Sequence, residues 1–307
     1  MRPLVRRTDR RSRPRSATRS STGPASLPIA VATPAFMRDI ARGWRSDGSS
    51  IGLVPTMGAL HAGHMSLVEA ACRENDRVVA SIFVNPIQFG AGEDLGRYPH
   101  SPERDLAMLR AAGVDAIYKP SVADMYPPGA STRINVHGIT DTLEGAARPG
   151  HFEGVATVVA KLFGAATPDR AYFGQKDAQQ VAVVRRLALD LDIGVEIRLC
   201  PTVREADGLA LSSRNAYLDA AQRRAAGCLS RALGLAAEAY ASGERDPGRL
   251  RTTLREAIEA EPLAELEYAD VVDPATFSTP GSLAVLAVRI GKTRLIDNHD
   301  LKLPYPG

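Results

Sequence analysis

The stretch VPTMGALHAGHMSLVEAA, residues 54–71, joins the end of an apolar run to an amphipathic helical pattern. The run SIGLVPT (50–56) predicts a strand, and apolar residues then recur at helical spacing from Met65 to Cys72. Two histidines, His61 and His64, stand at this junction on either side of Gly63. The junction predicts one β–α step of an α/β fold.

The same alternation continues on the C-terminal side. The run RVVASIFVN (77–85) predicts a strand buried on both faces, and SPERDLAMLRAAG (101–113) predicts a helix capped by Ser101. A short strand follows at 115–120, and helix, strand, helix and strand are predicted at 154–166, 170–174, 177–191 and 194–200. Repeated β–α units predict a Rossmann-like domain with a parallel sheet over residues 29–202.

The pattern changes after about Val203. Residues 219–260 predict two helices separated by the turn SGERDPG (242–248). The segments 266–273, 283–291 and 293–298 read as strands of an antiparallel sheet. We therefore expect a smaller α+β domain over residues 203–307.

The first 28 residues differ in composition from the rest. They hold eight arginines and one acidic residue, a net charge of +7, so the remaining residues carry −4 of the chain's total of +3. Such a segment cannot bury a core, which predicts a disordered or mis-started extension. A transit peptide and a nucleic-acid-binding arm are the alternatives.

The length of the apolar runs and the positions of the cysteines limit the classes of protein to which the chain can belong. No run approaches the ~20 residues of a transmembrane helix, and 44% hydrophobic content is ordinary for a globular protein. Cys72, Cys200 and Cys228 are far apart and form no CxxC pair. They are expected to be buried thiols of a cytoplasmic protein, with neither a disulfide framework nor a structural zinc site.

The H-x-G-H step has three interpretations: an anion site, structural histidines or metal ligands. A helix that starts at the carboxyl end of a parallel strand offers free N–H groups to a phosphate, and Gly58 and Gly63 permit close approach. The spacing differs from that of a helical zinc pair, and no third ligand lies nearby. The anion site is the favoured interpretation. The helix dipole should keep His64 neutral until a phosphate binds.

Three other segments follow predicted strands with polar side chains. FGQKDAQQ (173–180) places Lys176 at a strand end, with Asp177 as a helix cap. VREADGLALSSRN (203–215) offers hydroxyl groups and the cation of Arg214. FVNPIQF (83–89) offers the neutral amides of Asn85 and Gln88. Each alone also reads as a solvated surface or a polar turn. Together they favour phosphoryl or nucleotidyl transfer, since the chain has neither a P-loop nor a nucleophile elbow.

These motifs resemble those of the pantothenate synthetases (pantoate–β-alanine ligases), a family of the HxGH nucleotidyltransferase superfamily. The resemblance runs from about residue 50 to Asn298. It rests on VPTMGALHAGH, SIFVNPIQF, EDLGRYP, LEGAARPGHFEGV, PDRAYFGQKDAQQ, PTVREADGLALSSRN and TRLIDN, in family order.

The resemblance implies an ATP-dependent ligase that forms pantoyl adenylate and pyrophosphate, then transfers the pantoyl group to β-alanine and releases AMP. It implies His64 as proton donor, with His61, Lys176 and Arg214 as its catalytic companions. The implied ATP contacts are Met57, Gly58, Ala59, Leu60, His61, Ala62, Gly63, His64, Gly174, Gln175, Lys176, Asp177, Val203, Leu211, Ser212, Ser213 and Arg214. Gln88, Gln180 and Asn85 are the implied substrate contacts.

It further implies Mg²⁺ carried mainly on the phosphates, with Asp105 and Asp177 as candidate carboxylate contacts, and a homodimer whose small second domain is a lid. Two features depart from the family pattern: Gln175 stands where Glu is common, and the basic extension precedes the motifs. The rival hypotheses are another HxGH nucleotidylyltransferase, a nucleic-acid-binding protein and a degenerate nucleotide-binding regulator. No membrane partner is expected.

Overall fold

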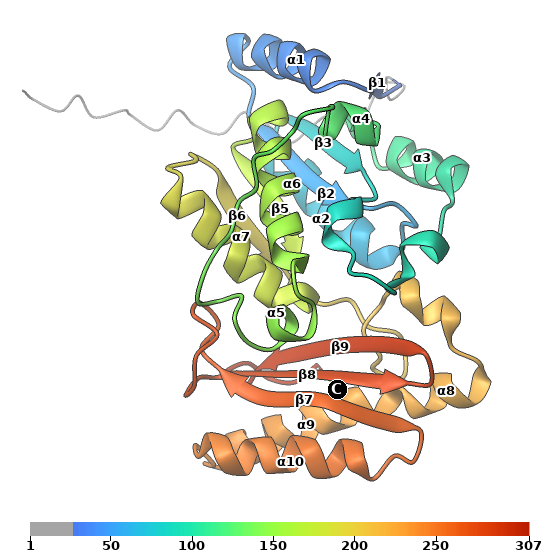
Figure 1. The fold of residues 1–307 in the computed structure, drawn as a ribbon, viewed down its shortest axis with the longest axis vertical. Helices are drawn as coiled ribbons and strands as arrows, with labels where there is room; N and C mark the ends of the chain where they lie inside the picture. The colour runs from blue at the N-terminus through green and yellow to red at the C-terminus, as the bar shows by residue number, and fades with distance from the viewer. Residues whose placement is uncertain (1–26, 307) are drawn as a thin grey trace, which may run out of the picture.

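The computed structural model describes residues 27–306, which form two sheets with flanking helices (Figure 1). The strands of the first sheet are β1 (Ile29–Val31), β2 (Ile51–Thr56), β3 (Arg77–Ile82), β4 (Ala116–Tyr118), β5 (Arg170–Gly174) and β6 (Glu196–Cys200). The helices between them are α1 (Pro34–Ser46), α2 (Ala62–Glu74), α3 (Pro102–Ala111), α4 (Val122–Met125), α5 (Glu144–Ala147), α6 (His151–Ala166) and α7 (Ala178–Asp190). Three short 3₁₀ helices, η1 (Pro86–Gln88), η2 (Asp94–Arg97) and η3 (Gln175–Asp177), follow strands or loops.

The first sheet has the order β1-β4-β3-β2-β5-β6, and every neighbouring pair is parallel. From β2 the chain moves outward to β3 and β4, and it returns to the other side of β2 as β5. The carboxyl ends of β2 and β5 therefore form a topological switch point, where ligands bind in open α/β sheets. The predicted Rossmann-like parallel sheet is confirmed.

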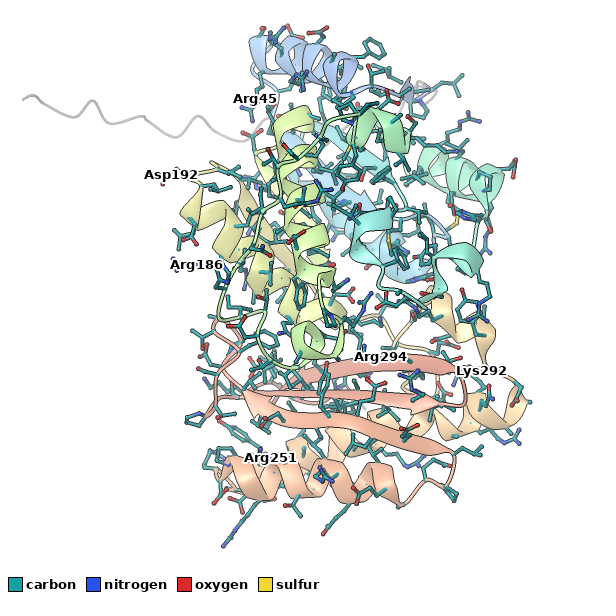
Figure 2. All side chains as sticks on the ribbon, in the orientation of Figure 1. Arg45, Arg186, Asp192, Arg251, Lys292 and Arg294 are labelled. Carbon is teal, nitrogen blue, oxygen red and sulfur yellow. The ribbon has the colours of Figure 1, made fainter. Side chains whose placement is uncertain are left out.

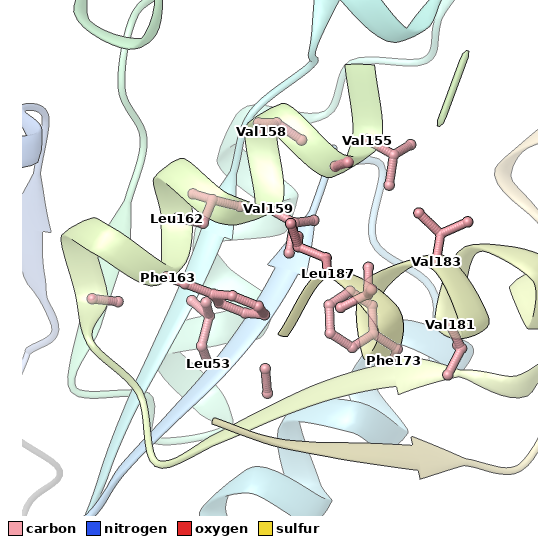
Figure 3. Close-up of a cluster of buried hydrophobic side chains, with 14 of the residues drawn as sticks. Leu53, Val155, Val158, Val159, Leu162, Phe163, Phe173, Val181, Val183 and Leu187 are labelled. Carbon is pink, nitrogen blue, oxygen red and sulfur yellow. The ribbon is translucent and has the colours of Figure 1, made fainter. Parts of the chain in front are cut away.

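Helices cover both faces of this sheet. Successive strand residues point to opposite sides, so each strand contributes to two clusters. Leu53 of β2 packs in a cluster with residues of α6 and α7, such as Val159 and Leu187 (Figure 3). The next residue, Val54, packs on the other side with α2 and Leu109 of α3. The continuous apolar run in β3 divides in the same way, which confirms the prediction of a strand buried on both faces.

The sequence patterns did not predict the first strand and the first helix of the structure. β1 has three residues, of which Val31 alone is buried, so it shows no periodicity. α1 begins with Pro34 at its first turn, after Thr33, whose hydroxyl accepts from the Phe36 N–H at 3.2 Å. The helix predicted at 101–113 is α3, but the side chain of Ser101 makes no capping hydrogen bond, so that detail was wrong.

The second sheet is antiparallel, in the order β7 (Ala264–Val272), β8 (Leu283–Ile290) and β9 (Thr293–Asp300). Before it come η4 (Ser213–Tyr217), α8 (Ala220–Ala225), α9 (Gly227–Ala241) and α10 (Pro247–Glu259). The two helices expected over 219–260 are thus three, because the chain turns at Ala226. α9 and α10 cover one face of the sheet, and β9 lies toward the larger sheet (Figure 1). The α+β class of this part is confirmed, and the domain limit at residue 202 stays a prediction.

The remaining expectations concern membrane helices, the cysteines and the N-terminal extension. No helix of residues 27–306 is long and apolar enough to cross a membrane. Cys200 and Cys228 are buried as predicted, whereas Cys72 is only half-buried. The extension predicted to be disordered, residues 1–28, lies outside the described residues except for its last two.

Candidate active site

A cavity of about 230 Å³ opens where the carboxyl ends of β2, β3, β5 and β6 meet. Most of the predicted site residues line it: Met57, His61, Gly63, His64, Asn85, Gln88, Gly174, Lys176, Asp177, Gln180, Val203, Leu211, Ser212, Ser213 and Arg214. Gly58, Ala59, Leu60, Ala62 and Gln175 line neither this cavity nor the larger one beside it. Four segments that are distant in sequence are therefore brought to one place.

The two histidines form the cap of helix α2. His61 is its N-cap residue, and its Nδ1 accepts from the Gly63 N–H at 3.2 Å. The Nδ1 of His64 accepts from the His61 N–H at 3.4 Å, and the two ring centroids are 4.1 Å apart. Because each Nδ1 is an acceptor, a neutral ring carries its proton on Nε2. Both rings can then donate an Nε2–H group without holding a positive charge.

Gly63 serves this ring arrangement. A Cβ at Gly63 would lie 2.9 Å from the Cε1 atom of His61, closer than carbon atoms pack. The sequence led us to expect that this glycine gives a phosphate access to the backbone. The structure shows that it makes room for the capping imidazole, and phosphate access stays a prediction.

Burial keeps both rings neutral. Burial, together with the nearby His61 and Lys176, lowers the pKa of His64 to about 3. Burial and Lys176 also lower the pKa of His61, against a smaller opposite effect of Asp177. The expected neutral state of His64 agrees with this environment, although loss of solvation is the main cause, rather than the helix dipole named from the sequence.

Asp105 holds the loop that leads into the histidines. Its carboxylate accepts from the N–H groups of Ala59 and Leu60, both at 2.8 Å, and only 2% of the residue is exposed. Gly58 and Ala59 have positive φ angles of 82° and 51°, so this turn needs an external support. Asp105 does not line the cavity, and its expected role as a metal contact stays a prediction.

The other candidate metal contact, Asp177, does line the cavity. It occupies the N-cap position of α7, but its side chain makes no capping hydrogen bond, contrary to the sequence prediction. Within residues 27–306, no group of three or more His, Cys, Asp or Glu side chains could hold a metal ion.

The neutral amides after β3 form a connected network. Asn85 donates to Gln88 Oε1 and to the Gly154 carbonyl, both at 3.0 Å, and accepts from the Tyr126 hydroxyl at 2.8 Å. Gln88 donates from Nε2 to the Met57 sulfur at 3.3 Å, a weak acceptor that a ligand oxygen can replace. Both N–H groups of Asn85 are used within the protein, so its role as a substrate contact stays a prediction.

Two arginines line the cavity beside the lysine. Arg214 donates to both carboxylate oxygens of Asp94, at 2.9 and 2.8 Å. Burial would raise the pKa of Asp94, but the hydrogen bonds and charge of Arg214 outweigh it and hold that pKa below its usual value. Arg148 is paired in the same way with Glu93, at 2.8 and 2.7 Å. Each fixed cation thus has a carboxylate partner in the segment 93–94.

Sequence reasoning did not single out Asp94, Arg148 or His151. His151 is buried, and its Nδ1 lies 2.9 Å from the Gln88 carbonyl oxygen. Burial and Arg148 lower the pKa of His151 to about 4. The motifs EDLGRYP and LEGAARPGHFEGV contain these residues, but the sequence shows nothing of their ion pairs, which join segments more than 50 residues apart.

A larger cavity of about 730 Å³ adjoins the first and reaches the second sheet. The two share Arg148, His151, Lys176, Asp177, Gln180, Ser212 and Arg214. Glu144 and Arg294 lie on its wall, where Arg294 of β9 donates to Glu144 Oε2 at 2.9 Å across the space between the sheets (Figure 2). The volume is within the usual range of small-molecule sites, roughly 300–1,000 Å³.

The family model for pantoate-β-alanine ligase matches residues 29–300. The pantothenate synthetase of Roseiflexus castenholzii is 57% identical over 254 residues, 81% of this chain and 91% of that protein. The pantothenate synthetase of Rubrobacter xylanophilus is 52% identical over 291 residues, 91% of this chain and 99% of that protein.

Solved structures agree with these relatives. A crystal structure of pantothenate synthetase from Thermus thermophilus superposes with a TM-score of 0.83 at 47% identity, covering 89% of this chain and 99% of that one. The pantoate-β-alanine ligase of Francisella tularensis, complexed with beta-gamma ATP and beta-alanine, gives a TM-score of 0.75 at 35% identity, covering 90% and 98%.

Proposed function

The chain belongs to the pantoate-β-alanine ligase family, and we propose that it joins pantoate to β-alanine in two steps in the cavity beside His64. In the first step a carboxylate oxygen of pantoate attacks the α-phosphorus of ATP, and the bond to pyrophosphate breaks. In the second, the amine of β-alanine attacks the carbonyl carbon of pantoyl adenylate, loses a proton and displaces AMP. Neither step needs a covalent bond to the enzyme, which fits a cavity whose described lining holds no activated nucleophile.

His61 and His64 act on the phosphates in this proposal. Their Nε2–H groups donate to oxygen atoms that gain negative charge as the α-phosphorus is attacked. Lys176 and Arg214 neutralise the same charge from the ends of β5 and the 203–214 segment. A bound polyphosphate also raises the proton affinity of His64, so His64 can pass a proton to the leaving group after ATP binds.

Gln88 and Gln180 are the proposed ligands of pantoate. Neutral amides recognise hydroxyl and carboxylate groups without changing charge between pH 5 and 8. Gln88 is held from behind by Asn85, and His151 contacts its carbonyl, so its amide is fixed before the substrate arrives. Gln88 also lies beside the proposed place of β-alanine.

The proposal also covers Mg²⁺, the oligomeric state, the role of the second sheet and the location of the protein. Mg²⁺ is expected to arrive on the ATP phosphates, since Mg²⁺ usually binds through substrate phosphates and one or two carboxylates. The homodimer, the lid role of the second sheet and its helices, and the cytoplasmic location stay predictions from family resemblance.

The capping geometry of the two histidines supports the proposal, because both Nδ1 atoms accept N–H groups of the helix start, which leaves two neutral Nε2–H donors on rings that line one cavity. The test is to incubate the protein with ATP, Mg²⁺ and pantoate, with and without β-alanine, and to follow AMP and pyrophosphate. AMP should require both pantoate and β-alanine. Formation of ADP, or AMP release without either substrate, would contradict the proposal. Sustained release of pyrophosphate without AMP would point to another HxGH nucleotidylyltransferase.

The variant His64→Ala tests the assigned role directly. Loss of one preorganised transition-state donor should lower adenylation by roughly 10²-fold or more. Turnover equal to wild type would remove His64 from the mechanism.

A further inference from the structure

Two consecutive residues of the second sheet contact both phosphate-binding segments. Asp297 and Asn298 lie on β9, with 2% and 4% of each residue exposed. Buried polar side chains on a strand are costly unless they are hydrogen-bonded, so their partners indicate what they are for. Those partners lie beside the cavity, not within the second sheet.

Asn298 holds the Lys176 segment. Its Nδ2 donates to the carbonyl oxygens of Gln175 and Lys176, both at 2.9 Å. Both amide hydrogens are therefore used on adjacent carbonyls of η3, and two bonds fix the turn in position and in orientation. Lys176 leaves the backbone at this point, so its ammonium group is placed by a residue that lies 122 positions later in the sequence.

Asp297 holds the other segment through Arg204. Arg204 donates to both carboxylate oxygens, at 2.6 and 3.0 Å, and to the Gly208 carbonyl at 3.0 Å. The two side chains are 9% and 0% exposed, so water screens the pair little. Arg204 pairs with Ala210 at the base of a turn that runs directly into Leu211 and the Arg214 segment.

Lys176 and Arg214 thus stand on separate segments that are both fixed to one dipeptide. We propose that Asp297 and Asn298 are positioning residues, through which the second sheet holds Lys176 and the Arg214 segment at the spacing that adenylation needs. The proposal rests on the roles of Lys176 and Arg214 in the proposed function. It assigns the second sheet a part in the chemistry of the site in addition to covering it.

Asn298→Ala tests this role with the full-length protein. It removes both hydrogen bonds while Lys176 remains, so kcat for AMP formation should fall about 10- to 100-fold, the scale expected for small displacements of a reacting group. Asn135→Ala is the control, because the exposed Asn135 donates to the half-buried Glu153 at 3.1 Å and neither residue lines a cavity of the site. Its kcat should equal that of wild type.

A double-mutant cycle separates positioning from general damage. If Asn298 acts through Lys176, Asn298→Ala should change kcat by less than about 2-fold in a Lys176→Ala background. An equal fall in both backgrounds, or no fall in the single variant, overturns the inference. Wild-type turnover of Lys176→Ala overturns the proposed function of Lys176 and this inference with it, whereas an impaired Lys176→Ala with an unaffected Asn298→Ala overturns the inference alone.

Two further variants keep the test independent of folding defects. Asn298→Ser retains one donor and should give an intermediate fall in the same cycle. Arg204→Gln with Arg214→Ala forms the corresponding cycle for the second segment, and here too the double variant should be no slower than Arg214→Ala. Additive losses in this cycle overturn the role of Asp297.

Discussion

Asp105→Asn is the sharpest test of how the loop before the histidines is held. Asparagine has nearly the same shape, but one carboxylate oxygen becomes an NH₂ group. One of the two N–H groups, of Ala59 or Leu60, then faces a donor instead of an acceptor. The surrounding turn cannot relax easily, because Gly58 and Ala59 already have positive φ angles.

The expected destabilisation is about 2–4 kcal/mol, the sum of two losses. A buried N–H group without a partner costs about 1–3 kcal/mol. The remaining bond changes from a charged to a neutral acceptor, which loses roughly another 1 kcal/mol. For a chain of this size the sum corresponds to a fall in melting temperature on the order of 10 °C.

Thermal unfolding followed by circular dichroism measures this change. Glu103→Gln is the matched control, because Glu103 is exposed and also lies in the first turn of α3, so both variants lose the same favourable charge at the helix start. Asp105→Asn should melt well below Glu103→Gln, and its AMP-forming rate should fall at every Mg²⁺ concentration. Equal melting temperatures, or activity restored by more Mg²⁺, would show that Asp105 does not support the loop.

Three further outcomes are expected. The pKa values of His64 and His151, lowered to about 3 and about 4, lie below the unfolded value of about 6.5, so the unfolded state binds more protons below pH 6.5. These two histidines should therefore lower the free energy of unfolding as the pH falls from about 6.5 toward 3. Urea unfolding of His64→Gln should show a shallower fall than wild type. Gln175→Glu should change kcat/KM by less than about 3-fold, because Gln175 does not line the cavity; a larger loss would place its side chain near the nucleotide. Deletion of residues 1–28 should leave ligase activity intact, and gel-shift assays of both proteins with DNA and RNA would reveal any nucleic-acid binding by the extension.

Sequence patterns predicted the fold well where the physical cause is local. Helix and strand periodicity located β2, α2, β3 and most later elements, since burial of one face imposes a repeat that can be read in a single segment. β1 was not predicted, because a strand of three residues is too short to show a repeat. Ser101 and Asp177 occupy N-cap positions, but whether a side chain turns back to the helix depends on its neighbours.

The residues of the candidate site also divide into those with a local sequence signal and those without one. His61, Lys176 and Arg214 could be found because each follows a predicted strand or turn, and parallel strands share one carboxyl edge. The supporting contacts of Asp105 and Asn298 could not be found, because their partners are 46 and 122 residues away. Supporting contacts of this kind depend on the assembled fold, and a single sequence holds no signal of them.

In the proposed function, the capping histidines explain how one site can bind a polyanion and still be stable without it. A lysine pair at the start of α2 would place two buried charges beside Lys176, at a large cost in solvation. Neutral imidazoles avoid that cost, and their Nδ1 atoms satisfy helix N–H groups that would otherwise lack partners. The arriving phosphates then meet N–H donors that are already oriented, next to cations on two other segments. The helix cap and the phosphate site are thus one structure, which is why the junction at residues 61–64 combines two histidines with a glycine.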